Sequence, residues 1–221
     1  MFPLIISERI KVVSPQLTLG LISCSVRNTP RNERLWEAIH AEKQSFRTRY
    51  TLEQIKTIPA IRATRDVYKL LGKDPNRYRP SAEALCRRIV RQVPIYQINT
   101  LVDLINLVSI RTGFSIGGFD ADKIEAPLML TVGTADDAFE AIGRGMLNVE
   151  GLPLYKDVLG GIGTPTSDHE RTKLTLETSR LLMIINSYSG KDGVQEAVEG
   201  SVKLLRQFAQ AENVEFGILN F

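Results

Sequence analysis

The chain has 221 residues, of which 43% are hydrophobic and 24% are charged, and its formal net charge at pH 7 is +3. These values are typical of a globular protein that can bury a core, and they exclude binders that rely on a strong overall charge. No apolar run approaches the ~20 residues of a membrane-spanning helix. Charged residues from Glu8 onward interrupt the apolar N-terminus too early for a signal peptide. We therefore expect a cytoplasmic protein that does not enter a membrane.

Cysteines and histidines are too few for a typical metal site. Cys24 and Cys86 are the only cysteines, and both lie in apolar stretches, which predicts two reduced thiols in the core. His40 and His169 are the only histidines, so a zinc ion would lack its usual set of ligands. We expect no metal and no cofactor.

Hydrophobic periodicity and capping residues predict strands near both ends of the chain and in its middle, with helices between them. The predicted strands are residues 17–27, 128–132, 152–159, 173–176, 181–187 and 214–221. The predicted helices are residues 29–50, 51–71, 80–91, 100–111, 136–141 and 192–211. Two glycine-rich stretches, residues 113–127 and 160–172, are predicted to be loops. This order favours an α+β fold in one domain.

The stretch from Arg62 to Arg91 concentrates positive charge, because it carries nine basic residues against three acidic ones. Such a local excess favours an anionic partner, either nucleic acid or a phosphate group. The cations near the end of the helix predicted from Pro80 also have a structural explanation, since they interact favourably with the helix dipole. The residues that we expect to contact nucleic-acid phosphates are Arg79, Arg87, Arg88 and Arg91.

The helix predicted for residues 100–111 is apolar around nearly its whole circumference, as buried helices are. Asp103 and Asn106 interrupt this pattern on one side, because three residues separate them. One explanation is local: Asp103 closes a capping box with Thr100, and Asn106 supports the backbone of a neighbouring turn. The other is that both side chains form a polar stripe that points into a functional site.

Residues able to do chemistry gather near the second glycine-rich stretch. The chain has no GxSxG nucleophile motif, no P-loop and no dinucleotide fingerprint. Asp157 lies where a predicted strand meets the glycine-rich stretch, a position that often carries function. The same stretch also contains Ser167, Asp168, His169, Arg171 and Thr172. Because its neighbours are charged, we expect the histidine to be solvated rather than to act as a general base.

Four segments, taken together, resemble a known family. They are RPSAEALCRRI, INTLVDLINLVS, GFDADKI and a GG loop that leads to RTKLTLET. In this order they are similar to the tRNA-editing (B3/B4) domain of the bacterial phenylalanyl-tRNA synthetase beta chain, and closer still to free-standing proteins built on that domain alone. The resemblance spans about residues 61–185. It implies a three-layer α+β sandwich, a single B3/B4-like domain over residues 1–221, and a family-variable portion at residues 1–60.

The resemblance also implies a partner and a site. In the synthetase this domain hydrolyses tyrosine wrongly attached to phenylalanine tRNA, so the implied partner is tRNA or aminoacyl-tRNA. The family's VDxxN pattern falls on Val102, Asp103 and Asn106, and its editing-pocket glutamate falls on Glu177, so the expected catalytic residues are Asp103 and Glu177. The expected pocket residues are Asn106, Asp157, Gly161, Arg171 and Thr172. Hydrolysis of an aminoacyl ester needs a positioned water and donors for the oxyanion, which the glycine-rich backbone can supply.

One departure from the family concerns the pocket itself. The synthetase has a histidine before its FD pair, whereas here Gly117 and Gly118 precede Phe119 and Asp120. Three hypotheses for function follow. The first is a stand-alone protein, not a complete synthetase, that binds tRNA or aminoacyl-tRNA and hydrolyses mischarged aminoacyl-tRNA in trans. The second is a non-catalytic RNA-binding or interaction module that has lost the editing pocket. The third is a binder of small amino-acid derivatives.

Overall fold

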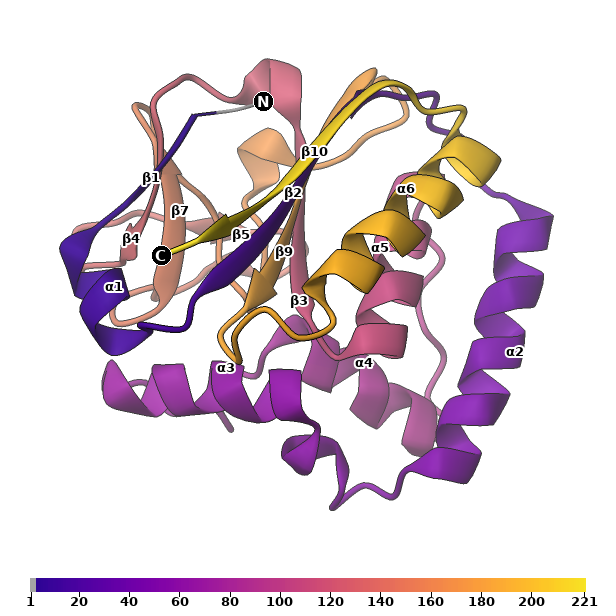
Figure 1. The fold of residues 1–221 in the computed structure, drawn as a ribbon, viewed down its shortest axis with the longest axis horizontal. Coiled ribbons are helices and arrows are strands. Elements are labelled where there is room, and N and C mark those ends of the chain that lie inside the picture. Colours follow the sequence, from indigo (N-terminus) through magenta and orange to yellow (C-terminus); the bar gives the residue numbers. More distant parts are fainter. Residues whose placement is uncertain (1–2) are drawn as a thin grey trace.

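The structure is a computed structural model that describes residues 3–221. Its main strands form two four-stranded sheets that stack face to face (Figure 1). The first sheet has the order β1 (Leu4–Ile6), β4 (Leu128–Val132), β7 (Pro153–Asp157) and β8 (Gly160–Gly163). The second has the order β10 (Glu212–Asn220), β2 (Thr18–Ser25), β9 (Arg180–Ser187) and β3 (Ser115–Asp120). A small hairpin joins β5 (Glu140–Ala141) to β6 (Gly145–Met146).

Four helices form the third layer, on the outer face of the second sheet (Figure 1): α2 (Glu33–Arg49), α4 (Ser81–Val90), α5 (Thr100–Thr112) and α6 (Val194–Ala209). Helix α1 (Glu8–Val13) instead contacts β4 of the first sheet, and α3 (Pro59–Leu70) contacts β9. Helices α5 and α6 pack directly on the sheet, and α2 covers α5 on its far side. The three-layer α+β sandwich implied by the resemblance is therefore confirmed.

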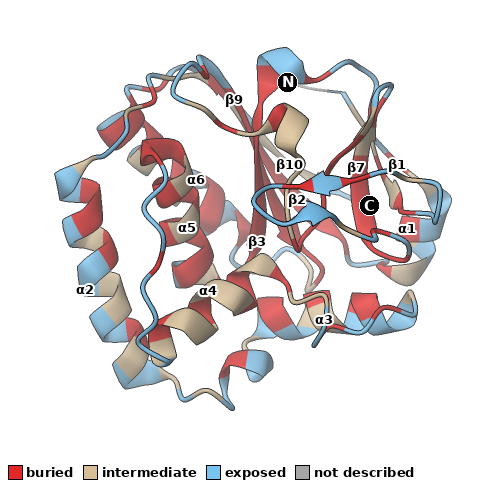
Figure 2. Ribbon diagram, turned by 180° about the vertical axis from the view of Figure 1, so that it is seen from behind, coloured by how far each residue is buried: buried red, intermediate tan, exposed pale blue. Residues whose placement is uncertain are grey.

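The second sheet is buried on both faces, which explains why its strands are apolar without a break. In β9, Leu182 and Ile184 belong to the core between the two sheets. Met183 and Ile185, which alternate with them, belong to the core beneath the helices. The view from behind shows β3, β9 and α5 largely buried, whereas one side of α2 is exposed (Figure 2). Whatever site this fold carries must therefore open at the edges of these layers.

Both glycine-rich stretches contain a strand, so the prediction of two loops is wrong over residues 115–120 and 160–163. Their glycines are needed for close packing rather than for flexibility. A Cβ atom on Gly118 would overlap Ile105 Cδ1, and one on Gly163 would lie 2.6 Å from Phe119 Cζ. Strands β3 and β8 therefore approach their neighbours at distances that exclude larger side chains.

Two helix starts differ from the prediction. Helix α2 begins at Glu33 rather than at residue 29, because the side chain of Asn32 caps it by accepting a hydrogen bond from Leu35 N at 3.1 Å. The helix predicted from residue 51 begins only at Pro59, whose fixed φ suits the first turn of a helix. Residues 51–58 form turns and a short 3-10 helix, Ile55–Thr57.

Two other predicted elements are absent from the described residues. Residues 136–141 form no helix, because the carboxylate of Asp137 accepts hydrogen bonds from Thr134 N and Oγ1, at 2.8 and 2.9 Å, and closes a turn. Residues 173–176 form no strand, because Thr175 N donates to the hydroxyl of Thr178 at 2.9 Å instead of to another strand. Strand β9 pairs with β2 and β3 instead.

Within residues 3–221, no helix is long and apolar enough to cross a membrane. The same residues contain no group of three or more histidine, cysteine, aspartate or glutamate side chains arranged to hold a metal ion.

Candidate functional site

Asp103 is a buried hydrogen-bond centre on α5. Its side chain is not the partner of Thr100 in a capping box, because Asn99 caps the helix by accepting from Val102 N at 3.0 Å. The Asp103 carboxylate instead accepts from Trp36 Nε1 at 2.7 Å and from Ile98 N at 3.1 Å. Burial raises the pKa of Asp103, and these two hydrogen bonds partly offset the rise. The residue therefore ties α5 to α2 and to the segment before α5.

Asn106 lines a cavity of about 410 Å³ between α5, α4, β3 and residues 167–174. The apolar part of the wall comes from Leu85, Val102, Ile105, Ile116 and Leu174, among others. The polar groups that line it belong to Ser81, Asn106, Ser109, Ser167, Asp168 and Lys173. An apolar chamber with a few polar groups is the usual form of a small-molecule site. The polar stripe predicted for α5 therefore divides: Asn106 lines this cavity, while Asp103 is bonded within the fold.

Asp168 is a cavity residue to which the sequence assigned no role. Its Oδ2 atom accepts a hydrogen bond from Gly118 N at 3.3 Å. Burial raises the pKa of its carboxyl group to about 7. The segment that carries it is held in place, because Thr164 Oγ1 accepts from Ser167 N at 3.1 Å and Ser81 N donates to Pro165 O at 2.8 Å. No local pattern in the sequence indicated this contact, because Gly118 lies 50 positions earlier in the chain.

Arg171 and Asp157 form a forked ion pair outside the cavity. Arg171 Nη2 lies 2.7 Å from Asp157 Oδ1, and Nη1 lies 3.1 Å from Oδ2. The same carboxylate accepts from Glu125 N and Leu159 N, both at 3.0 Å. The bond from Leu159 closes the turn of the β7–β8 hairpin, and the bonds from Glu125 and Arg171 join the hairpin to the segments around it, so the pair stabilises the frame of the site.

The remaining predicted pocket residues lie in that same frame or at the surface. Thr172 is fully buried, and a Cβ atom on Gly161 would lie 2.9 Å from Phe139 Cδ2. Glu177 lies in an exposed turn, where hydrogen bonding with Thr175 lowers the pKa of its carboxyl group. The lining of the cavity includes neither of the two expected catalytic residues, Asp103 and Glu177, and does not include Arg171.

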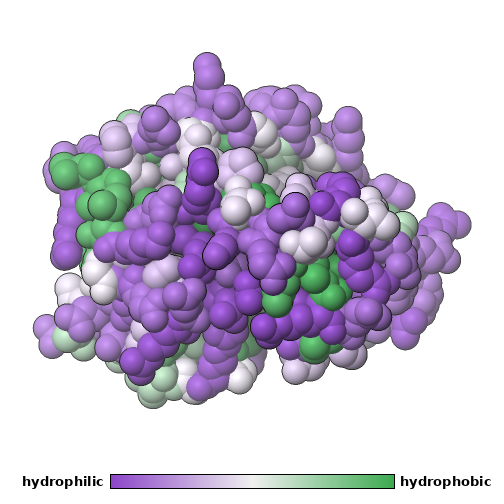
Figure 3. Space-filling view, turned by 90° about the horizontal axis from the view of Figure 1, so that it is seen from below, coloured by the Kyte–Doolittle hydropathy of each residue, from purple (hydrophilic) through white to green (hydrophobic). Residues whose placement is uncertain are grey.

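The arginines of the basic stretch lie on two different faces of α4. Glu83, whose side chain is buried, lies 2.8 Å from Arg65, 3.6 Å from Arg79 and 3.7 Å from Arg87. Glu83 and Arg87 are four residues apart on α4, and Arg79 lies just before the helix, so all three lie on the side of α4 that meets Arg65 of α3. The view from the side of α3 shows a largely hydrophilic surface (Figure 3). Two of the four predicted phosphate-binding arginines thus neutralise a buried carboxylate.

Arg88 lies on the other face of α4, beside the cavity. Residues 81, 85 and 88 share one face of the helix, and Ser81 and Leu85 line the cavity. Arg88 Nε donates to Pro94 O at 3.0 Å, and its guanidinium carbon lies 4.6 Å from the ring centroid of Tyr96. Tyr96 is 69% exposed. The segment after α4 therefore presents an aromatic ring, supported by a cation, two residues before Ile98, which lines the cavity. Arg91 is exposed at the end of the helix.

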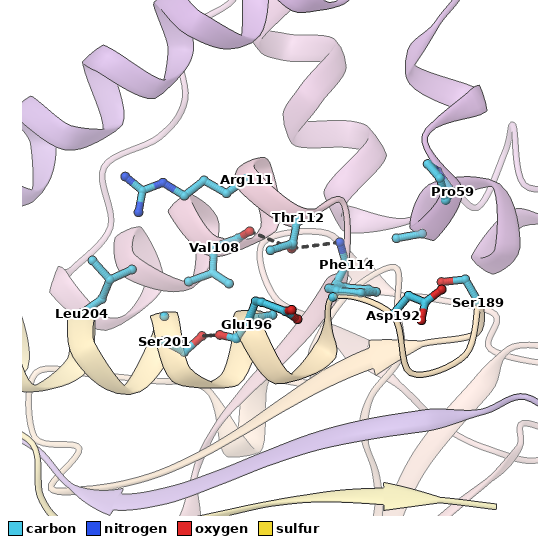
Figure 4. Close-up of a pocket in the computed structure, with 14 residues that line it drawn as sticks. Pro59, Val108, Arg111, Thr112, Phe114, Ser189, Asp192, Glu196, Ser201 and Leu204 are labelled. Carbon is cyan, nitrogen blue, oxygen red and sulfur yellow. Dashed lines mark hydrogen bonds between the residues drawn. The ribbon is translucent and has the colours of Figure 1, made fainter.

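A second and larger cavity, of about 590 Å³, lies between the end of α5 and α6 (Figure 4). Val108, Phe114 and Leu204 contribute to its apolar wall, and Arg111, Asp192 and Glu196 are its exposed charged residues. None of the site residues expected from the sequence lines it. The cavity beside Asn106 is therefore the better candidate for the functional site.

The sequence profile described as the B3/4 domain matches residues 63–199. The chain belongs to the B3/4 domain family. The matched region contains every residue that lines the cavity beside Asn106. Trp36, which holds Asp103, and strands β1 and β2 lie before it. The residues before the matched region therefore contribute strands to both sheets and support the matched core.

Solved structures are also similar to this chain, and one of them illustrates the likeness. It is an N-terminal fragment of the phenylalanyl-tRNA synthetase beta-subunit from Pyrococcus horikoshii, with 14% sequence identity and a TM-score of 0.46. The alignment covers 98% of this chain and 50% of that fragment, so this chain spans about half of the fragment's length. A search of curated proteins finds no significant relative.

Proposed function

We propose that this B3/4 domain binds the aminoacylated 3′ end of tRNA and hydrolyses the aminoacyl ester in trans. The observation that carries the proposal is the cavity of about 410 Å³ beside Asn106, which combines an apolar chamber with a polar rim inside the family-matched region. The size and lining suit an amino-acid side chain in the chamber and an ester group at the rim. The resemblance to the editing domain of the synthetase supports the same class of substrate.

Hydrolysis of an aminoacyl ester requires a correctly positioned water molecule rather than a strongly nucleophilic side chain. An ester carbonyl must meet a water molecule and hydrogen-bond donors that stabilise the oxyanion. In this proposal the Asn106 amide and the hydroxyl groups of Ser81 and Ser109 orient the ester and the water. Lys173, whose ammonium group is paired with Glu170, adds positive charge at the same cavity.

In this proposal, most of the residues that the resemblance implies support the site rather than contact the ester. Asp103 is a positioning residue that fixes α5, and Arg171, Asp157, Gly161 and Thr172 hold the frame that carries Asp168. A catalytic role for Glu177 remains a prediction, and it requires the exposed turn at residues 176–177 to meet the bound substrate.

At the rim, Arg88 and Tyr96 suit the terminal nucleotide of the RNA. An exposed aromatic ring can stack on a nucleobase, and such stacking needs no particular base. The guanidinium beneath the ring strengthens the platform and places a cation near the phosphate backbone. Arg91 extends the positive charge at the end of α4. Arg79 and Arg87 are paired with Glu83, so they attract RNA mainly through the electrostatic field of the whole protein.

The test is a deacylation assay of the full chain with a panel of correctly and wrongly charged tRNAs. We expect turnover of at least one aminoacyl-tRNA, a loss of turnover of about 10-fold or more in Asn106→Ala, and no change in Asp136→Asn, an exposed control. Salt-sensitive tRNA binding without turnover would favour the non-catalytic module. If the chain neither binds nor deacylates any tRNA of the panel, the proposal is wrong.

A further inference from the structure

Asp168 is a half-buried residue whose carboxylate lacks a cationic partner. Among residues 3–221, no basic side chain forms an ion pair with it, and the one hydrogen bond that its carboxylate accepts is the contact of 3.3 Å with Gly118 N. The two nearby cations are engaged elsewhere, since Lys173 pairs with Glu170 and Arg171 pairs with Asp157. Burying a carboxylate that has no cationic partner costs folding free energy. Asp168 is therefore suited to receive a positive charge from a ligand.

The carboxylate of Asp168 packs closely against a glycine of β8. A Cβ atom on Gly163 would lie 2.8 Å from Asp168 Oδ1, which is too close, whereas one on Gly117 would lie at an ordinary contact distance of 3.7 Å from the same oxygen. A Cβ atom on Gly118 would lie 3.1 Å from the Leu174 side chain, which lines the cavity beside Asn106. Asp168 is itself one of the residues that line this cavity, so a ligand bound there lies beside it.

We propose that Asp168 binds the α-ammonium group of the aminoacyl moiety, so that the cavity selects ligands with a free amine over those whose amine is blocked. The inference rests on the proposed function for the identity of the natural ligand, an aminoacyl ester. The ammonium group donates to the Asp168 carboxylate, which gains the partner it lacks. The apolar chamber then receives the side chain of the amino acid. Peptidyl and N-acylated esters, which carry no cation at this position, bind poorly.

Ionisation of Asp168 sets the pH dependence of binding. The groups that face it are the Gly118 N–H of β3, the Tyr155 hydroxyl of β7 and the backbone of Gly163 on β8, while Lys173 on the far segment stays paired. Since burial raises the pKa of the empty site to about 7, a proton competes with the ammonium group below that pH. Affinity for a permanently protonated amine should fall about tenfold for each unit below pH 7 and be constant above it.

Amino alcohols are suitable probes, because they keep the α-ammonium group and the side chain but contain no ester and no RNA. We would titrate the full chain with L-alaninol, L-valinol, L-leucinol, L-phenylalaninol and L-tyrosinol, and with the N-acetyl form of each, from about pH 5 to about pH 8. Heteronuclear NMR would give the dissociation constants and the location of binding. We expect at least one amine to bind in the cavity at least tenfold more tightly than its N-acetyl form.

Three variants complete the test. Asp168→Asn should remove the preference for the free amine and the pH dependence, and Asp136→Asn should change neither. Asp168→Glu should restore part of the preference, because the charge is kept. Folding of each variant is checked by its NMR spectrum. Equal binding of the amines and their N-acetyl forms by the folded wild type overturns the inference. So does an amine preference that survives in Asp168→Asn.

The outcome is independent of the tRNA assays. If amino alcohols bind through Asp168 but no tRNA is bound or deacylated, the ammonium site stands and the proposed function fails. If tRNA is deacylated but Asp168→Asn slows esters with free and blocked amines equally, the function stands. The carboxylate is then a general base rather than an ammonium anchor, and the inference is wrong.

Discussion

Asp103 shows at the scale of one residue how a buried polar group joins separate segments. Its carboxylate receives two N–H groups, one from the Trp36 indole and one from the backbone of Ile98. Both partners are donors, so both carboxylate oxygens must act as acceptors. The residue therefore fixes the start of α5 against α2, and through α5 it sets the position of Asn106 at the cavity.

Replacement of Asp103 by asparagine should be destabilising although the shape of the side chain is kept. In Asp103→Asn an NH₂ group takes the place of one carboxylate oxygen, so one of the two N–H donors faces another donor and loses its acceptor. We expect a loss of about 1–3 kcal/mol in the free energy of unfolding, measured by urea denaturation at pH 7. The exposed Asp136→Asn serves as control. A loss no larger than that of the control would show that the two hydrogen bonds do not hold α5.

Residue types and spacing revealed part of the site but not all of it. Asp103 and Asn106 could be singled out because polar residues on an otherwise apolar helix need a partner. Asp168 could not, since an aspartate in a polar, glycine-rich stretch is ordinarily solvated. Its importance depends on Gly118, 50 positions earlier in the chain, and such a contact leaves no local pattern.

Among the elements, β3 and β8 contain glycine for a different reason than a loop does. In these strands glycine allows close packing, whereas in a loop it gives the backbone conformational freedom. Both strands were predicted to be loops, because glycine is common where the backbone needs freedom. In the fold, Gly118 and Gly163 have neighbours that a Cβ atom would strike. The apolar elements without glycine, such as α5 and β9, were predicted at nearly their observed positions, because periodicity and burial point to the same structure there.

A matched pair of glycine-to-alanine substitutions tests this explanation. In Gly163→Ala the new methyl group would lie 2.6 Å from Phe119 Cζ and 2.8 Å from Asp168 Oδ1, so we expect a loss of about 1–3 kcal/mol of stability. In Gly200→Ala, within α6, no atom beyond the adjacent residues and the nearby helix backbone lies within 4 Å of the new methyl group, so we expect a gain of about 0.5–1 kcal/mol. Thermal or urea denaturation measures both. Equal effects in the two variants would mean that close packing is not the reason for glycine in β8.

At the scale of the whole molecule, chain order and residue composition were enough for the α+β class but not for the topology. Strand β2 comes from the first 60 residues and pairs with β9 and β10 from the end of the chain. Pairings over such distances depend on which faces become buried together, and one sequence does not specify this locally. That residues 1–60 vary within the family stays a prediction, although their strands belong to both sheets.

The distribution of charge over the molecule gives the last prediction. The basic stretch is one cluster in the sequence, but its residues separate in the fold. Arg87 lies beside the buried Glu83, whereas Arg88 lies over the ring of Tyr96 on another face of α4. If RNA binds at the cavity, Arg88→Ala should weaken tRNA binding and lower its salt slope by about one, without a large loss of stability. Arg87→Ala should instead lower the free energy of unfolding by about 1 kcal/mol, because Glu83 loses part of its compensation, and should change the salt slope less.

The two single variants, with Arg206→Ala on α6 as an exposed control, separate a local site from a general electrostatic effect. Filter binding of a labelled tRNA over a series of salt concentrations gives the slopes, and urea denaturation gives the stabilities. A local site requires the slope of Arg88→Ala to differ from that of Arg206→Ala. If all three variants lower the slope equally, the RNA responds to the net charge of the protein and not to the rim, and the platform of Arg88 and Tyr96 has no role in binding.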